Sequence, residues 1–181
     1  MDAIELLATR VSNGKLGEPA PDRETLEEIL AAALRAPDHG ALRPWTILVL
    51  RGEARDRLGE LLRQRLAEHR PDAQEADLAR AAKKPLRAPL IVVVAATPKP
   101  HPGVPEIEQI LSAGAVAHAI LYGLHARGFA GIWRTGDGAY DPEIKAALGL
   151  SPADHIVAFL YAGTATAPAP RFERGSIGDH V

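Results

Sequence analysis

The sequence predicts an α+β fold in which helices pack against one central β-sheet. Along its 181 residues, about four strand-like segments occur among about six helix-like ones without strict alternation, which disfavours parallel βαβ units. The clearest strand covers residues 88–96, which are continuously apolar and are therefore expected at the centre of the sheet with both faces covered. The length suits one compact domain.

The N-terminal part of the chain contains two expected helices. Apolar residues recur at helical spacing over residues 2–11, and turn-forming residues at 12–15 end that helix. Asp22 is the expected N-cap of a second helix, which runs to about residue 36 and is ended by Pro37. Two amphipathic helices therefore precede the first expected strand.

The middle of the chain contains strands on either side of two helices. Residues 45–50 are rich in β-formers and predict a short strand. Leucines at helical spacing predict a helix over residues 53–69, and an Ala-rich stretch predicts a weaker helix over 72–84. Four prolines within residues 97–105 predict a loop after the central strand.

The C-terminal part contains two more helices and two more strands. A long helix is expected over residues 106–127, followed by a glycine turn and a short strand that includes Trp133. Asp141 as N-cap and Pro142 at the first helical position predict a further helix. The last expected strand covers residues 155–163.

These elements predict one domain over residues 1–164. The remaining segment, residues 165–181, is rich in Pro, Gly and Ala and has no periodicity. It is expected to be disordered, or to be a C-terminal arm that packs on another surface, such as a partner chain.

Composition excludes several classes of function. The formal net charge is −2 and the pI is about 6.4, so there is no overall attraction to nucleic acid. The absence of cysteine excludes a disulfide scaffold, a thiol nucleophile and thiolate-bound metal sites.

Targeting and membrane signals are weak. The N-terminus begins with an acidic residue, Asp2, and has no basic region typical of a secretory signal. The longest apolar run, residues 110–124, is shorter than a bilayer span and is better explained by a buried helix. A cytoplasmic protein without a membrane partner is expected.

Common catalytic motifs are missing from the sequence. It contains no phosphate-binding P-loop, no nucleophile elbow and no HExxH motif. His118 and His125 are seven positions apart, which separates them by about 10 Å along one helix and makes a metal site improbable. Glu106 and Glu108 are explained by the helix dipole, so no residue is assigned a direct catalytic role and no metal is expected.

Three segments carry a functional hypothesis. Arg10, Ser12 and Lys15 place a guanidinium, a hydroxyl and an ammonium group close together, which suits a phosphate monoester. The alternative is an ordinary basic surface at a helix C-terminus.

The other two segments are denser in unusual residues. Residues 35–45 combine Arg35, a turn that contains His39, and a Pro-Trp entry into a strand, although a capped helix and a tight loop also explain them. Three glycines in residues 128–136 would let the backbone approach a flat ligand, beside which Trp133 could stack. The alternative is a turn into an edge strand with Trp133 in the core.

Together, these segments resemble the nitroreductase family, and in particular its minimal-length, YdjA-like subgroup. The resemblance rests on the order Arg-x-Ser, Ala-Pro-Asp-His-x-x-x-x-Pro-Trp, Gly-Phe-x-Gly-Ile-Trp-Arg and Phe-Leu-Tyr-x-Gly-Thr, and it covers residues 1–164. It implies a central mixed or antiparallel sheet flanked by helices in an intertwined homodimer. It further implies FMN bound without a covalent link at the dimer interface.

The resemblance also implies an activity and a set of site residues. NADH or NADPH would reduce FMN, which would then reduce a nitroaromatic, quinone or similar electron-poor small molecule in ping-pong order, so that the flavin carries the chemistry. The residues implied to contact FMN, with His39 reaching the flavin of the partner chain, are Arg10, Val11, Ser12, Lys15, Arg35, His39, Gly131, Ile132 and Trp133.

Two positions depart from the family pattern. Val11 stands where relatives often carry a second arginine, and the loss of one good phosphate contact would cost about 1.5–3 kcal/mol. Gly40 stands where the subgroup tends to have lysine. A flavin-binding or storage protein, a flavin-free structural dimer, and a divergent dehalogenase, dehydrogenase or flavin-cleaving enzyme remain alternatives.

Overall fold

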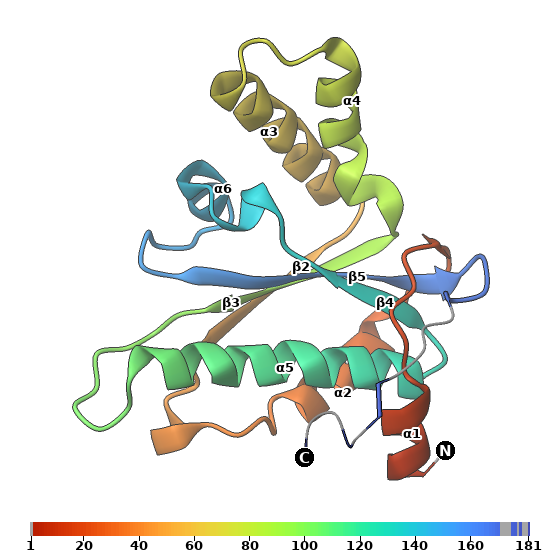
Figure 1. Cartoon of the computed structure of the whole chain (residues 1–181), viewed down its shortest axis with the longest axis vertical. Helices are drawn as coiled ribbons and strands as arrows, with labels where there is room; N and C mark the ends of the chain where they lie inside the picture. Colours follow the sequence, from red (N-terminus) through yellow and green to blue (C-terminus); the bar gives the residue numbers. More distant parts are fainter. Residues whose placement is uncertain (1, 171–174, 177, 179–180) are drawn as a thin grey trace.

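The computed structural model describes residues 2–170, 175, 176, 178 and 181. Figure 1 shows a sheet that lies between two layers of helices. The helices are α1 (Ala3–Thr9), α2 (Arg23–Ala33), α3 (Glu53–His69), α4 (Glu75–Lys83), α5 (Glu106–Ala126) and α6 (Pro142–Ala147), with 3-10 turns η1 (His39–Ala41), η2 (Lys84–Arg87) and η3 (Asp137–Ala139). The strands are β1 (Leu16–Gly17), β2 (Trp45–Leu50), β3 (Leu90–Ala96), β4 (Ala130–Arg134) and β5 (His155–Ala165).

The five strands form one antiparallel sheet. β5 pairs with β3 and β4, β3 also pairs with β2, and every pairing is antiparallel. The short β1 pairs with the C-terminal end of β5, where Leu16 lies opposite Ala165. The α+β prediction is confirmed, and the sheet is antiparallel rather than mixed.

The central strand β3 separates two apolar cores. All seven of its residues are buried, which confirms the expectation drawn from its continuous apolar sequence. Side chains alternate along a strand, so Val92 faces the core under α2 and α5, whereas Val93 faces the core under α3 and α6. The sheet therefore has one layer of α2 and α5 and an opposite layer of α3, α4 and α6 (Figure 1).

Helix α5 is a core helix of this first layer. It is the one helix in the described part of the chain that is long and apolar enough to cross a membrane. Its buried side chains include Val116, Ile120 and Leu124, which pack in the same core as alternate residues of β3. Packing against the sheet explains its apolar sequence.

Two predicted N-caps are confirmed. The Asp22 carboxylate accepts a hydrogen bond from the Thr25 N–H at 2.8 Å at the start of α2. The Asp141 carboxylate accepts from the N–H groups of Glu143 at 2.9 Å and Ile144 at 3.2 Å, with Pro142 at the first position of α6.

Asp141, at the start of α6, also contacts two side chains of α3. Its buried carboxylate lies 2.9 Å from Nε of Arg65 and 3.0 Å from Nε2 of His69, both on α3. Burial opposes ionisation of Asp141, but hydrogen bonds from Arg65, His69 and two backbone N–H groups outweigh burial and hold the pKa of the carboxyl below its ordinary value. A network of charged side chains around one buried carboxylate therefore connects α3 to α6.

Several element boundaries differ from the sequence expectation. α2 ends at Ala33, because the chain turns through residues 34–36 before Pro37, whose ring disfavours helix in the preceding residue. Ile4 and Leu7 on α1 are 75% and 50% exposed, so the apolar stripe of this helix is uncovered in the single chain. The strand β1 was not expected, since a two-residue strand carries no recognisable pattern.

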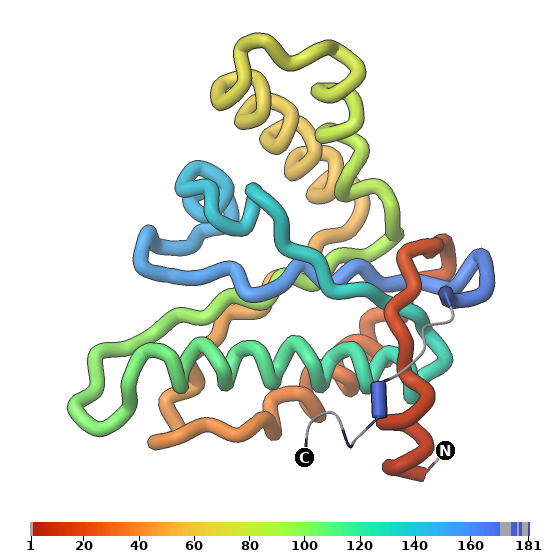
Figure 2. Tube along the Cα trace, in the orientation of Figure 1, coloured from red at the N-terminus to blue at the C-terminus, as the bar shows by residue number. Residues whose placement is uncertain are grey.

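The start of the expected arm packs on its own chain. β5 extends to Ala165, and beyond it Thr166 donates from its N–H to the carbonyl of Lys15 at 2.9 Å. Figure 2 shows the N-terminal segment running beside the end of β5. Of the remainder, residues 171–174, 177, 179 and 180 lie outside the described residues, and an arm over a partner chain stays a prediction.

Candidate functional site

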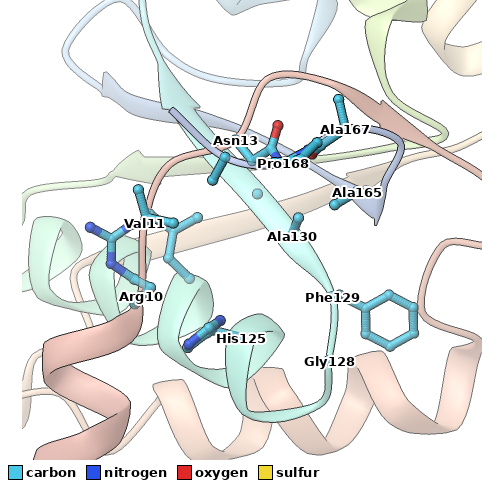
Figure 3. Close-up of a pocket in the computed structure, with 13 residues that line it drawn as sticks. Arg10, Val11, Asn13, His125, Gly128, Phe129, Ala130, Ala165, Ala167 and Pro168 are labelled. Carbon is cyan, nitrogen blue, oxygen red and sulfur yellow. The ribbon is translucent and has the colours of Figure 1, made fainter. Parts of the chain in front are cut away.

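The first candidate site forms where the N-terminal segment meets strand β4. The N–H of Asn13 donates to the carbonyl of Gly131 at 3.1 Å, which brings together two of the three segments singled out in the sequence. A pocket of about 370 Å³, hereafter the N-terminal pocket, lies beside this contact (Figure 3). It is lined by Arg10, Val11, Asn13, Leu121, His125, Gly128, Phe129, Ala130, Gly131, Ala165, Ala167, Pro168 and Ala169.

Arg10 supplies the cationic group of this pocket. Its guanidinium carbon lies 5.5 Å from the centroid of the Tyr122 ring on α5, within the range of a cation–π interaction. His125 lies on the same side of the pocket (Figure 3). Its Nε2 is 3.0 Å from Oγ1 of Thr9, which connects α5 to the end of α1. A guanidinium held against an aromatic ring at a pocket wall suits recognition of an anionic group such as a phosphate.

Asn13 organises the turn that carries the basic residues. It is 3% exposed, its side-chain nitrogen donates to the carbonyl of Ala167 at 2.9 Å, and its side-chain oxygen accepts from the N–H of Lys15 at 2.9 Å. From the sequence, Asn13 was expected only to form a turn. An asparagine side chain can both donate and accept in this way, but its long-range partner is not visible from the sequence.

Ser12 and Lys15 belong to the same segment without lining the pocket in this chain. Ser12 is half-buried between Val11 and Asn13, and the Lys15 side chain is exposed. The carbonyl of Lys15 is already used by Thr166. Both side chains could therefore bind the part of an anion that extends out of the pocket.

The three predicted residues of β4 have different surroundings because side chains alternate along the strand. A Cβ on Gly131 would lie 3.1 Å from both the Tyr161 carbonyl oxygen and Cδ2 of Leu121, so a larger residue there would push these neighbours aside by a few tenths of an ångström. Ile132 packs against the core under α3 and α6. Trp133 packs against the core under α2 and α5, and its Nε1–H donates to the carbonyl of Val157 at 3.0 Å. In one chain, only Gly131 of the three lines the N-terminal pocket.

A second cation lies close to this segment. A Cβ on Gly14 would be 3.2 Å from Nη2 of Arg134, so the N-terminal segment passes directly over the end of β4. Arg134 is exposed and close enough to oppose, together with Arg87, the rise that burial causes in the pKa of the Tyr161 phenol. The sequence motif contained Arg134, but nothing in its local pattern indicated that it approaches Gly14.

The third predicted segment lies elsewhere in the chain. Arg35 is exposed and lines a separate pocket of about 500 Å³ with Leu34, Ala36, Asp38, Ala41, Arg43 and Trp45. His39 lies on η1 and contacts α5, with its Nδ1 2.7 Å from Oε2 of Glu108.

The two groups of predicted residues do not meet within one chain. The N-terminal pocket touches α5 at Leu121 and His125, and His39 touches the same helix at Glu108. At 1.5 Å per residue, the two pocket positions lie about 20 and 25 Å from Glu108 along the helix axis. Within one chain, the predicted residues therefore form two separate groups.

The described residues contain no group of three or more His, Asp or Glu side chains able to hold a metal ion. His118, one of the two histidines on α5, instead packs edge-on against the Tyr122 ring, with centroids 4.6 Å apart. A site in this chain thus rests on cations, backbone groups and apolar walls.

The fold and the pocket define a class: small α+β proteins in which a basic N-terminal segment and a glycine-bearing strand enclose one pocket. Comparison with known proteins identifies the family. A family model described as "Nitroreductase family" matches residues 7–164, and the chain belongs to this family.

Individual relatives agree with this assignment. The chain is 44% identical over 164 residues to a protein of Escherichia coli strain K12 named "Putative NAD(P)H nitroreductase YdjA", covering 91% of this chain and 88% of the relative. Among solved structures, a nitroreductase-like family protein from Bacillus cereus superposes with a TM-score of 0.82 at 22% identity, covering 100% of this chain and 95% of that one. A mutant of NfnB, an FMN- and NADPH-dependent nitroreductase from Sphigopyxis sp. strain HMH, gives 0.80 at 20% identity, with 100% and 98% covered. The resemblance noted in the sequence is confirmed at the level of family and subgroup.

Proposed function

We propose that the protein is an FMN-dependent NAD(P)H oxidoreductase that acts as a homodimer on nitroaromatic, quinone or similar electron-poor small molecules. The observation that carries this proposal is the contact between Asn13 and Gly131, which joins the basic N-terminal segment to the glycine-bearing strand at one pocket. The names of its relatives, including the 44% identical protein from Escherichia coli, support a nicotinamide-dependent activity.

The residues present suit FMN. The Arg10 guanidinium lies at the pocket wall, and Ser12 and Lys15 follow on the same segment, so a phosphate would find cationic and hydroxyl donors. Leu121 and Phe129 give the pocket apolar walls that exclude water from a flat ring. Val11 offers the phosphate only backbone groups, because its side chain has no donor.

A homodimer completes the site. Several large apolar side chains are uncovered in the single chain, among them Leu34, which caps the C-terminus of α2, and Ile107 and Leu111 on α5; they are 47%, 59% and 65% exposed. Exposed apolar surface of this kind is typical of an interface. In a two-fold dimer whose α5 helices cross antiparallel, the His39 end of one chain would face the N-terminal pocket of the other.

The proposed mechanism gives the redox chemistry to the cofactor. When bound, FMN supplies hydride acceptance from NADH or NADPH and electron delivery to the acceptor in ping-pong order. Arg10, Ser12 and Lys15 bind the phosphate and ribityl part, whereas the backbone around Gly131, Ile132 and Trp133 lines the ring. Arg35 and His39 complete the site from the partner chain, and no side chain is required as a general acid or base.

One spectroscopic experiment tests the activity. The purified protein is incubated with FMN, and its visible spectrum is recorded before and after anaerobic addition of NADH or NADPH. We expect bound flavin whose absorption bleaches, and whose colour returns when a quinone or nitroaromatic is added. Bound flavin that does not bleach would indicate a flavin-storage protein instead, and a colourless protein that ignores FMN would contradict the proposal.

Mixed dimers test whether both chains contribute to each site. In an Arg10→Ala/His39→Ala heterodimer, one site is intact and the other carries both substitutions. We expect about half of the wild-type FMN stoichiometry in isolated heterodimers. A heterodimer that recovers no FMN would contradict a shared site.

The compartment and the binding partners follow from the same proposal. Helix α5 is explained as a core helix and the net charge is close to zero, so we propose a cytoplasmic enzyme without a nucleic-acid or membrane partner. Fractionation of cells that express the tagged protein at native level tests this compartment.

A further inference from the structure

His39 is held by a specific side-chain contact. Its Nδ1 lies 2.7 Å from Oε2 of Glu108, which is in the first turn of α5, and the two side chains are 61% and 45% exposed. The two residues are 69 positions apart in the sequence, so this contact is a product of the tertiary structure.

The backbone that carries His39 is fixed on both sides. Oγ of Ser112 donates to the carbonyl of Pro37 at 2.6 Å, and the Asp38 carboxylate accepts from the N–H groups of Leu42 at 3.2 Å and Arg43 at 2.7 Å. We call residues 37–43 the His39 loop. Three of its residues have a positive φ angle: 74° at Gly40, 51° at Ala41 and 48° at Arg43. Such backbone is strained for non-glycine residues and persists only where its surroundings determine it.

The helix end that carries Glu108 is equally well anchored. The neighbouring Gln109 is 2% exposed, and its amide bonds the N–H and the carbonyl of Lys99, both at 2.9 Å. Nζ of Lys99 donates in turn to the carbonyl of Leu42 in the His39 loop at 2.6 Å. The side-chain torsions of His39 are therefore the main freedom left, and Glu108 restricts them.

We propose that Glu108 is a positioning residue that selects the tautomer and the ring orientation with which His39 meets FMN; this inference rests on the proposed function. An ionised carboxylate only accepts hydrogen bonds, so Nδ1 of a neutral His39 carries the proton and donates it to Glu108. Nε2, at the opposite corner of the ring, is then a hydrogen-bond acceptor. His39 would therefore offer an acceptor to FMN, whose ribityl hydroxyls and ring N–H are donors.

The chain contains a matched control for this arrangement. Glu106, in the same first turn of α5, contacts Nε2 of His155 at 2.8 Å, with side chains 62% and 43% exposed. The Glu106–His155 pair is also a carboxylate–imidazole pair with a similar exposure, but the carboxylate contacts Nε2 rather than Nδ1. The two histidines are thus expected to show opposite tautomers, and a change at Glu106 should leave His39 unaffected.

Nitrogen-15 NMR of the FMN-free protein tests the tautomer directly. At a pH where both histidines are neutral, we expect Nδ1 of His39 and Nε2 of His155 to be the protonated nitrogens, with assignments made from His39→Gln and His155→Gln variants. Glu108→Ala should shift His39 toward the Nε2-protonated form common in free histidine and leave His155 unchanged. Glu106→Ala should leave both tautomers unchanged, because His155 already has the form that free histidine prefers. A His39 tautomer that does not respond to Glu108→Ala would overturn the inference, whatever the protein does with flavin.

FMN affinity, measured by quenching of flavin fluorescence, tests the consequence. We expect Glu108→Ala to raise the dissociation constant about threefold to tenfold, which is below the roughly tenfold to hundredfold losses typical of residues that orient metal-binding histidines. Glu106→Ala should change it less than twofold, and Glu108→Ala should have no further effect in a His39→Ala background. Equal affinities for the Glu108→Ala and Glu106→Ala proteins would overturn the positioning role, whereas a wild-type protein that binds no FMN would overturn the proposed function itself.

Discussion

The two faces of the sheet use polar side chains for different purposes. On the face of α2 and α5, polar contacts hold exposed loops in unusual conformations, as Asp38 does for the His39 loop. On the face of α3, α4 and α6, a buried carboxylate, Asp141, joins two helices through Arg65 and His69. An exposed carboxylate thus shapes a loop that we propose to be part of the binding site, whereas a buried carboxylate contributes to stability, because desolvated charges depend most on their partners.

The largest loss of stability is expected on substitution of Asp141. Asp141→Ala removes a buried partner of Arg65 and the N-cap of α6, and we expect it to lower the free energy of unfolding by about 3 kcal/mol, as measured by urea denaturation. FMN affinity below the unfolding transition should not change. A loss of FMN binding by the folded variant would show that the two faces are not independent.

The same carboxylate predicts a pH dependence. Because the pKa of Asp141 is lower in the folded protein than its ordinary value of 3.8, its stabilisation is fully present above about pH 4 and is lost as the pH falls below it. The stability difference between the wild type and Asp141→Asn should therefore shrink in acid. A difference that stays constant from neutral pH to pH 3 would contradict the role of the ionised carboxylate.

The next prediction concerns the opposite face of the sheet. Arg10→Ala should weaken FMN binding about tenfold to hundredfold, which is the value of one charge-assisted contact, while lowering stability by less than about 1 kcal/mol. Fluorescence titration measures the first effect and urea denaturation the second. Arg23→Ala is the matched control, because the Arg23 side chain is 91% exposed on α2 and pairs with Glu27 on the same helix. An Arg10→Ala protein with wild-type affinity would exclude Arg10 from the phosphate site.

A smaller effect is expected in the His39 loop. Asp38→Ala removes the acceptor of the Leu42 and Arg43 N–H groups, and we expect a loss of about 1–2 kcal/mol. Hydrogen exchange at these two amides should accelerate more than exchange in β3. Substitution of the exposed Asp72 by alanine serves as the control, and unchanged amide exchange in Asp38→Ala would show that the loop is held by other contacts.

The smallest expected effect is an increase in stability rather than a loss. Ala41 has a φ of 51°, so Ala41→Gly should relieve backbone strain and raise stability by about 0.5 kcal/mol. The same substitution inside α4, Ala76→Gly, should lower stability by about 1 kcal/mol because glycine is unfavourable in a helix. If both substitutions were destabilising to the same extent, the loop would not be strained at Ala41.

Local sequence predicted most of the helices and strands but less of the site. Trp45–Leu50, Glu53–His69 and the caps at Asp22 and Asp141 were predictable because each depends on residues a few positions away. The role of Asn13 was not, since its partners at Gly131 and Ala167 lie more than a hundred residues further along the chain.

The sequence by itself determined the α+β class, the central strand and, through its resemblance to a family, the segments that could bind FMN. Only the tertiary structure decided that Arg10 and Gly131 share a pocket, that Trp133 packs into the core, and that His39 meets Glu108 on α5. The physical reason is the separation along the sequence. Caps and periodicity depend on residues a few positions apart, whereas a pocket depends on which distant segments the packed sheet brings together.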